Sequence, residues 1–571
     1  MVPAAMTGPT TDEPGTGGNV TNTPQPLLEV RGLSVSYRTR GGTVQAVRGV
    51  DLDVWPGQVT AVVGESGSGK STTAHAIIRL LAANGGIDAG TVRFGRQDLS
   101  SLSERELRTV RGARIGLVPQ DPTVSLNPVK RIGEQVAEVL RIHQLTTRRS
   151  APSDAVAILE QAGLPDAATR ARQYPHELSG GMRQRALIAV AIAGKPKLII
   201  ADEPTSALDV TVQRVILDHL QHLTEQSGTA VLLVTHDLGV AADRAQRIVV
   251  MSEGRVVEAG PTRDILDNPQ HAYTRRLLAS APSLATARPR ATVTTPSAPG
   301  TAPLVEVQGA VKEFRLPGSG TLRAVDDVSF TLHRGRTLAL VGESGSGKST
   351  TARLVLRLTD PTAGRIVFDG ADVTTARGAP ARQLRRRAQL VYQNPYASLD
   401  PRFSIGEVIT EPLRAFKVGD RASRLARARE LLDRVALPAS TLERRPAELS
   451  GGQRQRVAIA RALALSPDLV VCDEPVSALD VSVQAQVLDL LAELQADTGV
   501  AYLFISHDLA VVRQIAHHVA VMRAGRIVET GTAEDLFARP RHAYTRELLA
   551  AIPGGRYPRT ASEPLETKEH A

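Results

Sequence analysis

One ten-residue segment, GESGSGKSTT, occurs twice in the sequence, at 64–73 and again at 342–351. Its glycines let backbone amides close around phosphate groups, its lysine can reach terminal phosphates, and the serine after the lysine can bind Mg²⁺. Each copy stands between a short apolar run and a segment of helical periodicity, which is the setting of a nucleotide-binding loop. The segment therefore predicts two sites for ATP and Mg²⁺. The predicted nucleotide contacts are Gly64, Glu65, Ser66, Gly67, Ser68, Gly69, Lys70, Ser71 and Thr72, and Gly342, Glu343, Ser344, Gly345, Ser346, Gly347, Lys348, Ser349 and Thr350.

An adjacent Asp–Glu pair follows a second apolar run in each copy, at Asp202–Glu203 and at Asp473–Glu474. The Asp can join the loop serine in holding Mg²⁺, which leaves the Glu to orient or deprotonate a water molecule. A strand cap would explain either pair alone. However, a histidine stands 33 residues after each Glu, at the end of the next predicted strand, where an imidazole can contact the γ-phosphate. These histidines are His236 and His507.

The duplicated motifs belong to an internal repeat. Lys70 and Lys348 are 278 positions apart, and later pairs of motifs are 271 positions apart, so the halves differ only by small deletions. The segment 285–302 between them is rich in Pro, Ala and Thr, which is typical of an extended linker. We therefore expect domains at 27–284 and 303–553, a disordered tail at 1–26 and a polar tail at 554–571.

Strands alternate with helices in both halves, which predicts an α/β fold with a mostly parallel sheet and with the site at the carboxyl ends of the strands. A late hairpin is predicted at 248–260 and at 519–531. The predicted buried strands are 59–63, 197–201 and 231–235 in the first half and 338–341, 469–472 and 502–506 in the second.

Composition narrows the class of protein. The net charge of +9 and the pI of 9.9 are compatible with nucleic acid or an anionic membrane as a partner. The basic residues are scattered, however, and ordinary solvated faces explain clusters such as 385–387, so no nucleic-acid partner is predicted. The single cysteine, Cys472, excludes an intrachain disulfide and is expected to be an inert core thiol. No apolar run is long enough to cross a bilayer or to form a signal peptide, so a transported molecule would need a path formed by another chain.

The segments LSGGM at 178–182 and LSGGQ at 449–453 resemble the signature of ATP-binding cassette (ABC) proteins, and the resemblance extends over about nine-tenths of the chain. It implies two P-loop domains, each with a mostly parallel core, an antiparallel β subdomain and a helical subdomain. It also implies that the signature of one cassette caps the nucleotide held by the other. Lys70 with Asp202, Glu203 and His236 would then face Ser450 and Gly452, and Lys348 with Asp473, Glu474 and His507 would face Ser179 and Gly181. The implied signature contacts are Ser179, Gly180 and Gly181, and Ser450, Gly451 and Gly452.

The resemblance assigns further positions. Gln120 and Gln393 match the glutamine that contacts Mg²⁺ or water beside the groove for the permease, so they join Ser71, Asp202, Ser349 and Asp473 as candidate Mg²⁺ ligands. Tyr37 and Phe314 match an aromatic residue that stacks on adenine, although either could be a core residue. Asp209 and Asp480 match the loop that joins the two sites. Met182 and Val190 depart from the pattern, but no catalytic position is degenerate.

Segments 121–128 and 394–401 after these glutamines, and 268–275 and 539–546 after each cassette, resemble the dipeptide, oligopeptide and nickel importers. The resemblance implies a peripheral subunit on the cytoplasmic face of the membrane, working with two permeases and an extracytoplasmic binding protein. Di- or oligopeptides are the favoured cargo, with glutathione, peptide antibiotics or nickel as alternatives. The cysteine cluster of many such importers is missing, so no iron–sulfur cluster is predicted. A tandem-cassette translation factor remains the alternative class, but such proteins have a long charged linker, unlike 285–302.

Overall fold

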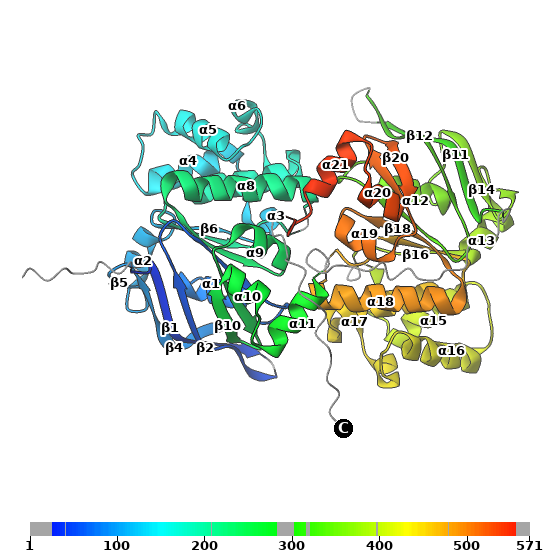
Figure 1. The fold of residues 1–571 in the computed structure, drawn as a ribbon, viewed down its shortest axis with the longest axis horizontal. Helices are drawn as coiled ribbons and strands as arrows, with labels where there is room; N and C mark the ends of the chain where they lie inside the picture. The colour runs from blue at the N-terminus through cyan, green and yellow to red at the C-terminus, as the bar shows by residue number, and fades with distance from the viewer. Residues whose placement is uncertain are drawn as a thin grey trace, which may run out of the picture.

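The computed structural model describes residues 25–39, 41–206, 208–281, 302–315, 320–394, 398–477 and 479–555. The predicted tails, 1–26 and 554–571, and the predicted linker, 285–302, lie almost entirely outside these residues. Figure 1 shows two α/β halves side by side, the first coloured blue to green and the second green to red.

The two halves contain the same succession of strands and nearly the same succession of helices. The strands of the first half are β1 (Leu28–Thr39), β2 (Gly42–Val54), β3 (Val59–Val63), β4 (Gly85–Phe94), β5 (Gln97–Asp98), β6 (Ile115–Val118), β7 (Leu198–Asp202), β8 (Ala230–Thr235), β9 (Arg247–Ser252) and β10 (Arg255–Pro261). Its helices are α1 (Lys70–Ile77), α2 (Glu104–Val110), α3 (Pro122–Ser125), α4 (Ile132–Ile142), α5 (Ala151–Gln161), α6 (Ala167–Arg170), α7 (Gly180–Ile192), α8 (Val210–Ser227), α9 (Leu238–Arg244), α10 (Thr262–Asp267) and α11 (Ala272–Ser280).

The second half follows the same order. Its strands are β11 (Val305–Arg315), β12 (Thr321–Leu332), β13 (Thr337–Val341), β14 (Ala363–Phe368), β15 (Ala371–Asp372), β16 (Ala388–Val391), β17 (Leu469–Asp473), β18 (Ala501–Ser506), β19 (His518–Arg523) and β20 (Arg526–Thr532). Its helices are α12 (Lys348–Val355), α13 (Gly378–Arg387), α15 (Ile405–Ala415), α16 (Arg421–Arg434), α17 (Gly451–Leu463), α18 (Val481–Thr498), α19 (Leu509–Ile515), α20 (Ala533–Ala538) and α21 (Ala543–Ala550).

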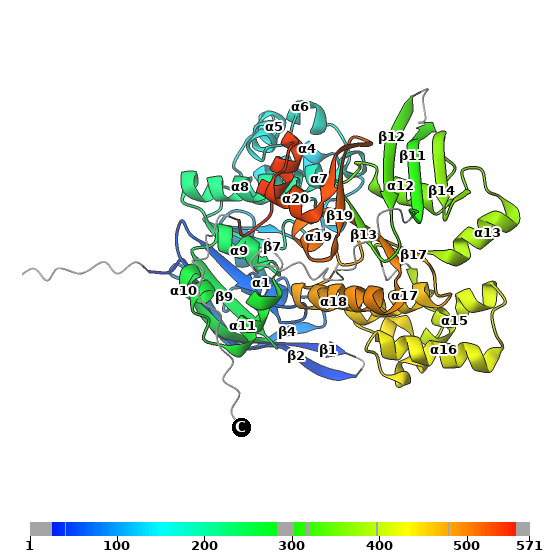
Figure 2. The same ribbon diagram turned by 45° about the vertical axis from the view of Figure 1, so that its right-hand side comes forward.

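The described residues of each half form a six-stranded sheet and a four-stranded sheet. The larger sheets have the orders β10-β9-β3-β8-β7-β6 and β16-β17-β18-β13-β19-β20. Their strands are parallel except at one edge, where β9 with β10 and β19 with β20 form the predicted late hairpins. The smaller, antiparallel sheets have the orders β2-β1-β4-β5 and β12-β11-β14-β15. In Figure 2 the small sheet of the second half stands apart from helices α15 to α17.

The glycine loop of each half is anchored by a strand at the centre of the larger sheet. Alternate residues of β3 point to opposite faces. Val59, Ala61 and Val63 pack with the cluster that includes α7 and α8, whereas Val62 packs with α1 and the small sheet. A strand buried on both faces gives the loop after it a rigid starting point.

The predicted fold class is confirmed, since each half combines a mostly parallel sheet, an antiparallel sheet and a separate group of helices. Cys472 lies fully buried in β17, and burial raises the pKa of its thiol, as expected of an inert core residue. Within the described part of the chain, the structure contains no helix with both the length and the apolar character needed to span a membrane.

Candidate active site

Each glycine loop joins a central strand to a helix, as the sequence predicts. In the first half, Gly69 is the N-cap of α1 and has a φ of 97°. Gly64 has a φ of 151°, and a Cβ atom there would lie 2.2 Å from the carbonyl oxygen of Met251. Both positions therefore require glycine, and the loop can present its amides and the N-terminus of α1 to an anion.

The lysine that ends each loop is folded back into the loop. Lys70 Nζ donates hydrogen bonds of 2.8 and 2.9 Å to the carbonyl oxygens of Gly64 and Glu65. Lys348 makes the two equivalent bonds, both of 2.7 Å, in the second loop. Burial lowers the pKa of both lysines. Phosphate oxygens inside the loop would be strong partners for these poorly solvated ammonium groups.

A serine and an aspartate of each half are joined by a hydrogen bond. Ser71 Oγ donates to Asp202 Oδ1 at 2.9 Å, and Ser349 Oγ donates to Asp473 Oδ1 at the same distance. Burial raises the pKa of both aspartates. A hydroxyl beside a carboxylate is an oxygen donor set that suits Mg²⁺, and a divalent cation there would stabilise the ionised carboxylate.

The glutamate after each aspartate lies between a histidine and a glutamine. Glu203 Oε1 is 3.2 Å from His236 Nδ1, and Glu203 Oε2 accepts a 2.9 Å hydrogen bond from Gln120 Nε2. The second half repeats this arrangement with distances of 3.2 and 2.8 Å. Its members are Glu474, His507 and Gln393. In each half, the segments that follow three strands of the larger sheet thus surround one carboxylate at the carboxyl ends of those strands.

The backbone of both glutamates is in the left-handed region. Glu203 has a φ of 45° and Glu474 a φ of 47°. This conformation is strained for a residue with a side chain, and it persists only where the surroundings enforce it. One such restraint is the 2.9 Å hydrogen bond from Glu203 N to the carbonyl oxygen of Val234 in β8. The chain therefore turns sharply after β7, and the carboxylate meets the histidine that follows β8.

Each glutamate and histidine adjust the pKa of the other. Burial raises the pKa of Glu203, but the hydrogen bond and charge of His236 outweigh burial and leave this pKa below its ordinary value of 4.5. Burial lowers the pKa of His236, but Glu203 raises it to a net value above 6.5. Glu474 and His507 show the same directions. An ionised carboxylate held in this way can orient water or accept its proton.

The two sites face each other across one cavity. Ser66 N in the first glycine loop donates a 2.9 Å hydrogen bond to Asp480 Oδ1 of the second half. In the opposite direction, Thr211 Oγ1 of the first half donates a 2.9 Å bond to Glu343 Oε1. A cavity of about 600 Å³ lies between the halves. Its lining includes Glu203, His236 and Gln120 and their counterparts Glu474, His507 and Gln393.

The signature serines are helix N-caps. Ser450 Oγ accepts a 3.3 Å bond from Gln453 N, and Gln453 Oε1 accepts a 3.0 Å bond from Ser450 N. Ser179 Oγ accepts a 3.3 Å bond from Met182 N, but the Met182 side chain has no oxygen to return the second bond. Neither serine is among the described residues that line the cavity between the halves. Their contact with nucleotide stays a prediction.

The signature glycines also allow close helix packing. A Cβ atom at Gly181 would lie 2.6 Å from Cγ1 of Val212, and one at Gly452 would lie 2.4 Å from Cγ1 of Val483. Glycine is therefore needed where α7 meets the first turn of α8, and where α17 meets α18. This packing role accompanies the phosphate contact that the resemblance implies.

The two predicted adenine-stacking residues differ in their surroundings. The Tyr37 ring is so close to Gly85 that a Cβ there would lie 2.6 Å from Cε1 of Tyr37, and the Tyr37 hydroxyl is 3.4 Å from Thr72 Oγ1. Phe314 is 40% exposed, with Lys312 Nζ 5.1 Å from its ring centroid. Phe314 is thus open to a planar ligand, whereas Tyr37 is partly packed. Stacking stays a prediction for both.

Sequence reasoning missed one residue in each half. Tyr273 Oη accepts a 3.0 Å hydrogen bond from Glu65 N, and Tyr544 Oη accepts a 3.1 Å bond from Glu343 N. Both tyrosines lie in the repeated segment HAYTR, at 271–275 and 542–546. That identity between halves was the available signal, but it does not indicate what the tyrosines contact.

Comparison with known families agrees with this geometry. The family described as "ABC transporter" matches residues 47–206 and 325–477, which hold both glycine loops and both Asp–Glu pairs. The chain therefore belongs to the ABC transporter family, as an ATPase with two cassettes. A second family, "Oligopeptide/dipeptide transporter, C-terminal region", matches residues 257–307 and 528–570. The chain is thus an ABC ATPase of the importer group that the sequence indicated.

Individual relatives are similar over most of their length. "Glutathione import ATP-binding protein GsiA" of Pectobacterium atrosepticum is 46% identical, over 92% of this chain and 89% of its own length. The protein of the same name from Escherichia coli O157:H7 is 45% identical with the same coverage. Among solved structures, the dimeric structure of MJ0796, a bacterial ABC transporter cassette, is 30% identical over 41% of this chain and 99% of that chain, with a TM-score of 0.38.

Proposed function

We propose that the chain hydrolyses ATP at two complete sites to drive the uptake of short peptides, glutathione among them, through separate permease chains. The observation that carries the proposal is the duplicated catalytic arrangement. Glu203 with His236 and Gln120, beside a glycine loop and a Ser–Asp pair, is repeated in the second half with distances that agree within about 0.1 Å.

Each residue has a distinct proposed role. The glycine-loop amides and Lys70 bind the phosphates of ATP, and Ser71 and Asp202, with Gln120 beside them, hold Mg²⁺. Bound Mg²⁺ would neutralise charge on the phosphates. Glu203 orients the attacking water and accepts its proton, while His236 keeps that carboxylate ionised and contacts the γ-phosphate. The second half assigns the same roles to Lys348, Ser349, Asp473, Gln393, Glu474 and His507.

ATP would join the halves. Each glycine loop already touches the opposite half, through Ser66 with Asp480 and through Glu343 with Thr211. We infer that ATP draws the halves further together, so that Ser450 caps the first nucleotide and Ser179 the second. A ligand bound more tightly by the closed pair shifts the equilibrium toward it, and hydrolysis releases that preference.

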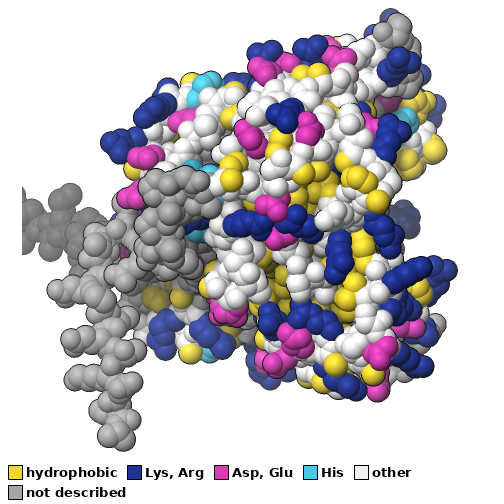
Figure 3. Space-filling view, turned by 90° about the vertical axis from the view of Figure 1, so that its right-hand side faces the viewer, with side chains coloured by type: hydrophobic (Ala, Val, Ile, Leu, Met, Phe, Trp, Pro, Cys, Tyr) yellow, Lys and Arg dark blue, Asp and Glu magenta, His cyan; other side chains and the backbone are white. Residues whose placement is uncertain are grey.

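A permease is proposed to dock in a groove on the outer side of the second half. This basic groove, of about 1300 Å³, lies between α13, β16, α15 and α17 and includes Gln393. Its described lining includes six arginines and three carboxylates. The arginines are Arg353, Arg357, Arg377, Arg382, Arg385 and Arg461. Figure 3 shows Lys and Arg side chains gathered around a recess with hydrophobic side chains on this side of the molecule. The groove suits an amphipathic helix that carries acidic residues.

The cargo proposal depends on relatives, because an ATPase does not touch the cargo. The GsiA relatives are named for glutathione import, and the matched C-terminal region is named for oligopeptides and dipeptides. Glutathione is itself a tripeptide, so both names indicate short peptides. Docking to two permeases, with a binding protein outside, places the chain on the cytoplasmic face of the membrane.

Hydrolysis by the full chain tests the two-site proposal. Glu203→Gln and Glu474→Gln should each reduce hydrolysis at their own site by at least about 100-fold, the contribution of a general base. The measurement is single-turnover release of phosphate by each variant. A variant that retains wild-type turnover at both sites would contradict the role of its glutamate. Uptake of labelled glutathione and dipeptides by cells with and without the gene tests the cargo.

A further inference from the structure

A tyrosine near the end of each half reaches back to the glycine loop of the same half. Tyr273, in the first turn of α11, is 208 positions from Glu65, whose backbone N–H donates to its hydroxyl. Tyr544, in the first turn of α21, is 201 positions from its partner Glu343. The tyrosines are only 7% and 1% exposed. Both glycine loops are therefore tied at the same point.

The loop residue that the tyrosine binds also contacts the lysine. In the first half, Glu65 donates its N–H to Tyr273 and accepts the ammonium of Lys70 on its carbonyl oxygen, at 3.0 and 2.9 Å. The second half repeats both bonds, at 3.1 and 2.7 Å. One loop residue thus connects a tyrosine hydroxyl to the ammonium that is proposed to bind phosphate.

The tyrosines are themselves held in place. The carboxylate of Glu258, in β10, accepts hydrogen bonds from Gln270 N at 2.8 Å and His271 N at 3.1 Å. His271 Nδ1 then accepts a 3.2 Å bond from Tyr273 N. The second half repeats this set at 2.8, 3.0 and 3.1 Å. These bonds fix the backbone of the segment that carries each tyrosine.

That segment lies against the opposite half. Helix α11 of the first half contacts α18 of the second, and α21 contacts α8 of the first (Figure 1). The N-cap of α18, Asp480, accepts the N–H of Ser66, the loop residue after Glu65. In the other loop, Glu343 is bonded to Thr211 in the first turn of α8. Each loop is thus held jointly by its own tyrosine and by the helix that this tyrosine's segment touches.

We propose that Tyr273 and Tyr544 are positioning residues, which transmit the docking of the opposite half to the glycine loop of their own half and so set its affinity for ATP. The inference rests on the proposed nucleotide sites and adds residues that act through Glu65 or Glu343. Burial raises the pKa of Tyr544 to about 12 and raises that of Tyr273 above 10.0, so both hydroxyls keep their proton at neutral pH.

Binding of a fluorescent ATP analogue to the full-length chain tests each site separately. In a Lys348→Ala background, in which the first site is intact, Tyr273→Phe should weaken binding about fivefold, the effect of one net hydrogen bond. In a Lys70→Ala background, Tyr544→Phe should do the same. Tyr502→Phe is the matched control, because its buried hydroxyl, within β18, has no hydrogen-bond partner among the residues that the structure describes. An unchanged affinity in the tyrosine variants, or an equal loss with the control, would overturn the proposal.

A double-mutant cycle separates transmission from simple support of the fold. Asp480→Ala should change ATP affinity at the first site, and this change should shrink at least about threefold when Tyr273 is already Phe, because coupled residues act non-additively. Equal changes in the two backgrounds would contradict transmission. A double variant with both Lys70→Ala and Lys348→Ala tests the proposed nucleotide sites themselves. If it still binds two nucleotides, those sites are wrong, and this outcome is distinct from failure of the tyrosine inference.

Discussion

Glu203 and His236 form an ion pair in which each partner sets the charge of the other. Burial alone lowers the pKa of His236, and the nearby carboxylate reverses that shift. We therefore predict that Glu203→Gln lowers the pKa of His236 from above 6.5 to below 6.5. The measurement is an NMR titration of the histidine ring carbons, with His236 assigned by its absence in His236→Gln.

His507 provides the internal control, because its partner Glu474 is unchanged in Glu203→Gln. The raised pKa of His236 also determines how the stability of the fold depends on pH. The ion pair stabilises the fold fully below the unfolded-state pKa near 6.5, and this contribution is lost as the pH rises through the higher folded-state pKa. A His236 pKa that stays above 6.5 in the variant would show that another group causes the shift.

Residue types and spacing, with the family resemblance, predicted the glutamate, histidine and glutamine that the structure brings together in each half, and the catalytic roles of these residues stay predictions. Glu203 and His236 are 33 residues apart, and Glu474 and His507 repeat this spacing in the second half. A chance occurrence of the spacing is therefore not a sufficient explanation. The left-handed φ of Glu203 could not be predicted, because surrounding contacts rather than local preference enforce it. The contact of Tyr273 with Glu65 was missed for a similar reason. It joins positions 208 apart, and no periodic pattern marks it.

At the scale of elements, α13 differs from its counterpart α2. Helix α2 begins with Glu104, which accepts a 2.7 Å bond from Arg111 and lies 3.8 Å from Arg108. Helix α13 carries no carboxylate, and Arg382 and Arg385 donate to backbone carbonyl oxygens instead. The basic groove of the second half therefore retains positive charge that α2 neutralises in the first half.

This difference predicts that the basic groove recognises an acidic helix. The probe is a labelled amphipathic helical peptide with glutamates on one face. Replacing both Arg382 and Arg385 by Gln should weaken its binding to the full chain about fivefold at low salt, since exposed ion pairs contribute up to about 1 kcal/mol. Arg386→Gln, on the same helix but outside the described groove lining, is the control. Equal binding of a matched lysine peptide would contradict the prediction.

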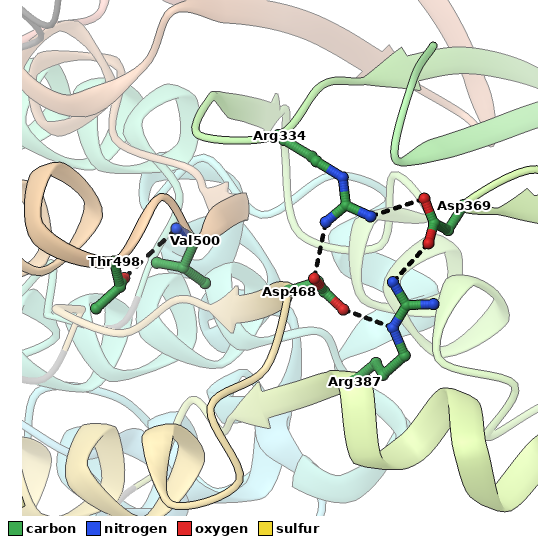
Figure 4. Close-up of polar contacts among 6 residues, drawn as sticks. All are labelled: Arg334, Asp369, Arg387, Asp468, Thr498 and Val500. Carbon is green, nitrogen blue, oxygen red and sulfur yellow. Dashed lines mark hydrogen bonds and ion pairs between the residues drawn. The ribbon is translucent and has the colours of Figure 1, made fainter.

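A closed ring of ion pairs joins the two sheets of the second half (Figure 4). Arg334 bonds to Asp369 and Asp468, both at 2.7 Å, and Arg387 bonds to the same two carboxylates, both at 2.6 Å. Asp369 follows β14 in the small sheet, whereas Asp468 precedes β17 in the large sheet. In the first half, the position equivalent to Arg334 is occupied by Pro56, which cannot form an ion pair. The ring is therefore specific to the second half.

We predict that Arg334→Gln destabilises the second half by about 1 kcal/mol or less, because the ring is partly exposed and screened. Hydrogen bonds from Arg387 and Arg334 lower the pKa of Asp369 below 3.8. Its contribution is therefore complete above that pH and is lost as the pH falls through the folded-state pKa. The measurement is the thermal unfolding midpoint at pH 7 and at pH 3. A difference between variant and wild type that is larger at pH 3 would contradict this account.

At the scale of the whole molecule, the two halves interlock through their cores as well as their loops. Val210, in the first half, packs with the core cluster of the second half, and Val481 of the second half packs with that of the first. The repeat predicted two equivalent cassettes, but it could not predict these contacts. Val210 and Val481 occupy equivalent positions, and nothing in their spacing distinguishes a contact within a half from one between halves.

The central claim is that each nucleotide is bound by the glycine loop of one half and the signature serine of the other. Pairs of substitutions test it through the number of ATP molecules bound per chain at equilibrium. Lys70→Ala with Ser450→Ala damages one site twice, so the account predicts one ATP per chain. Lys70→Ala with Ser179→Ala damages both sites, and the account predicts weak or no binding. The opposite order, or equal binding by the two double variants, would contradict it.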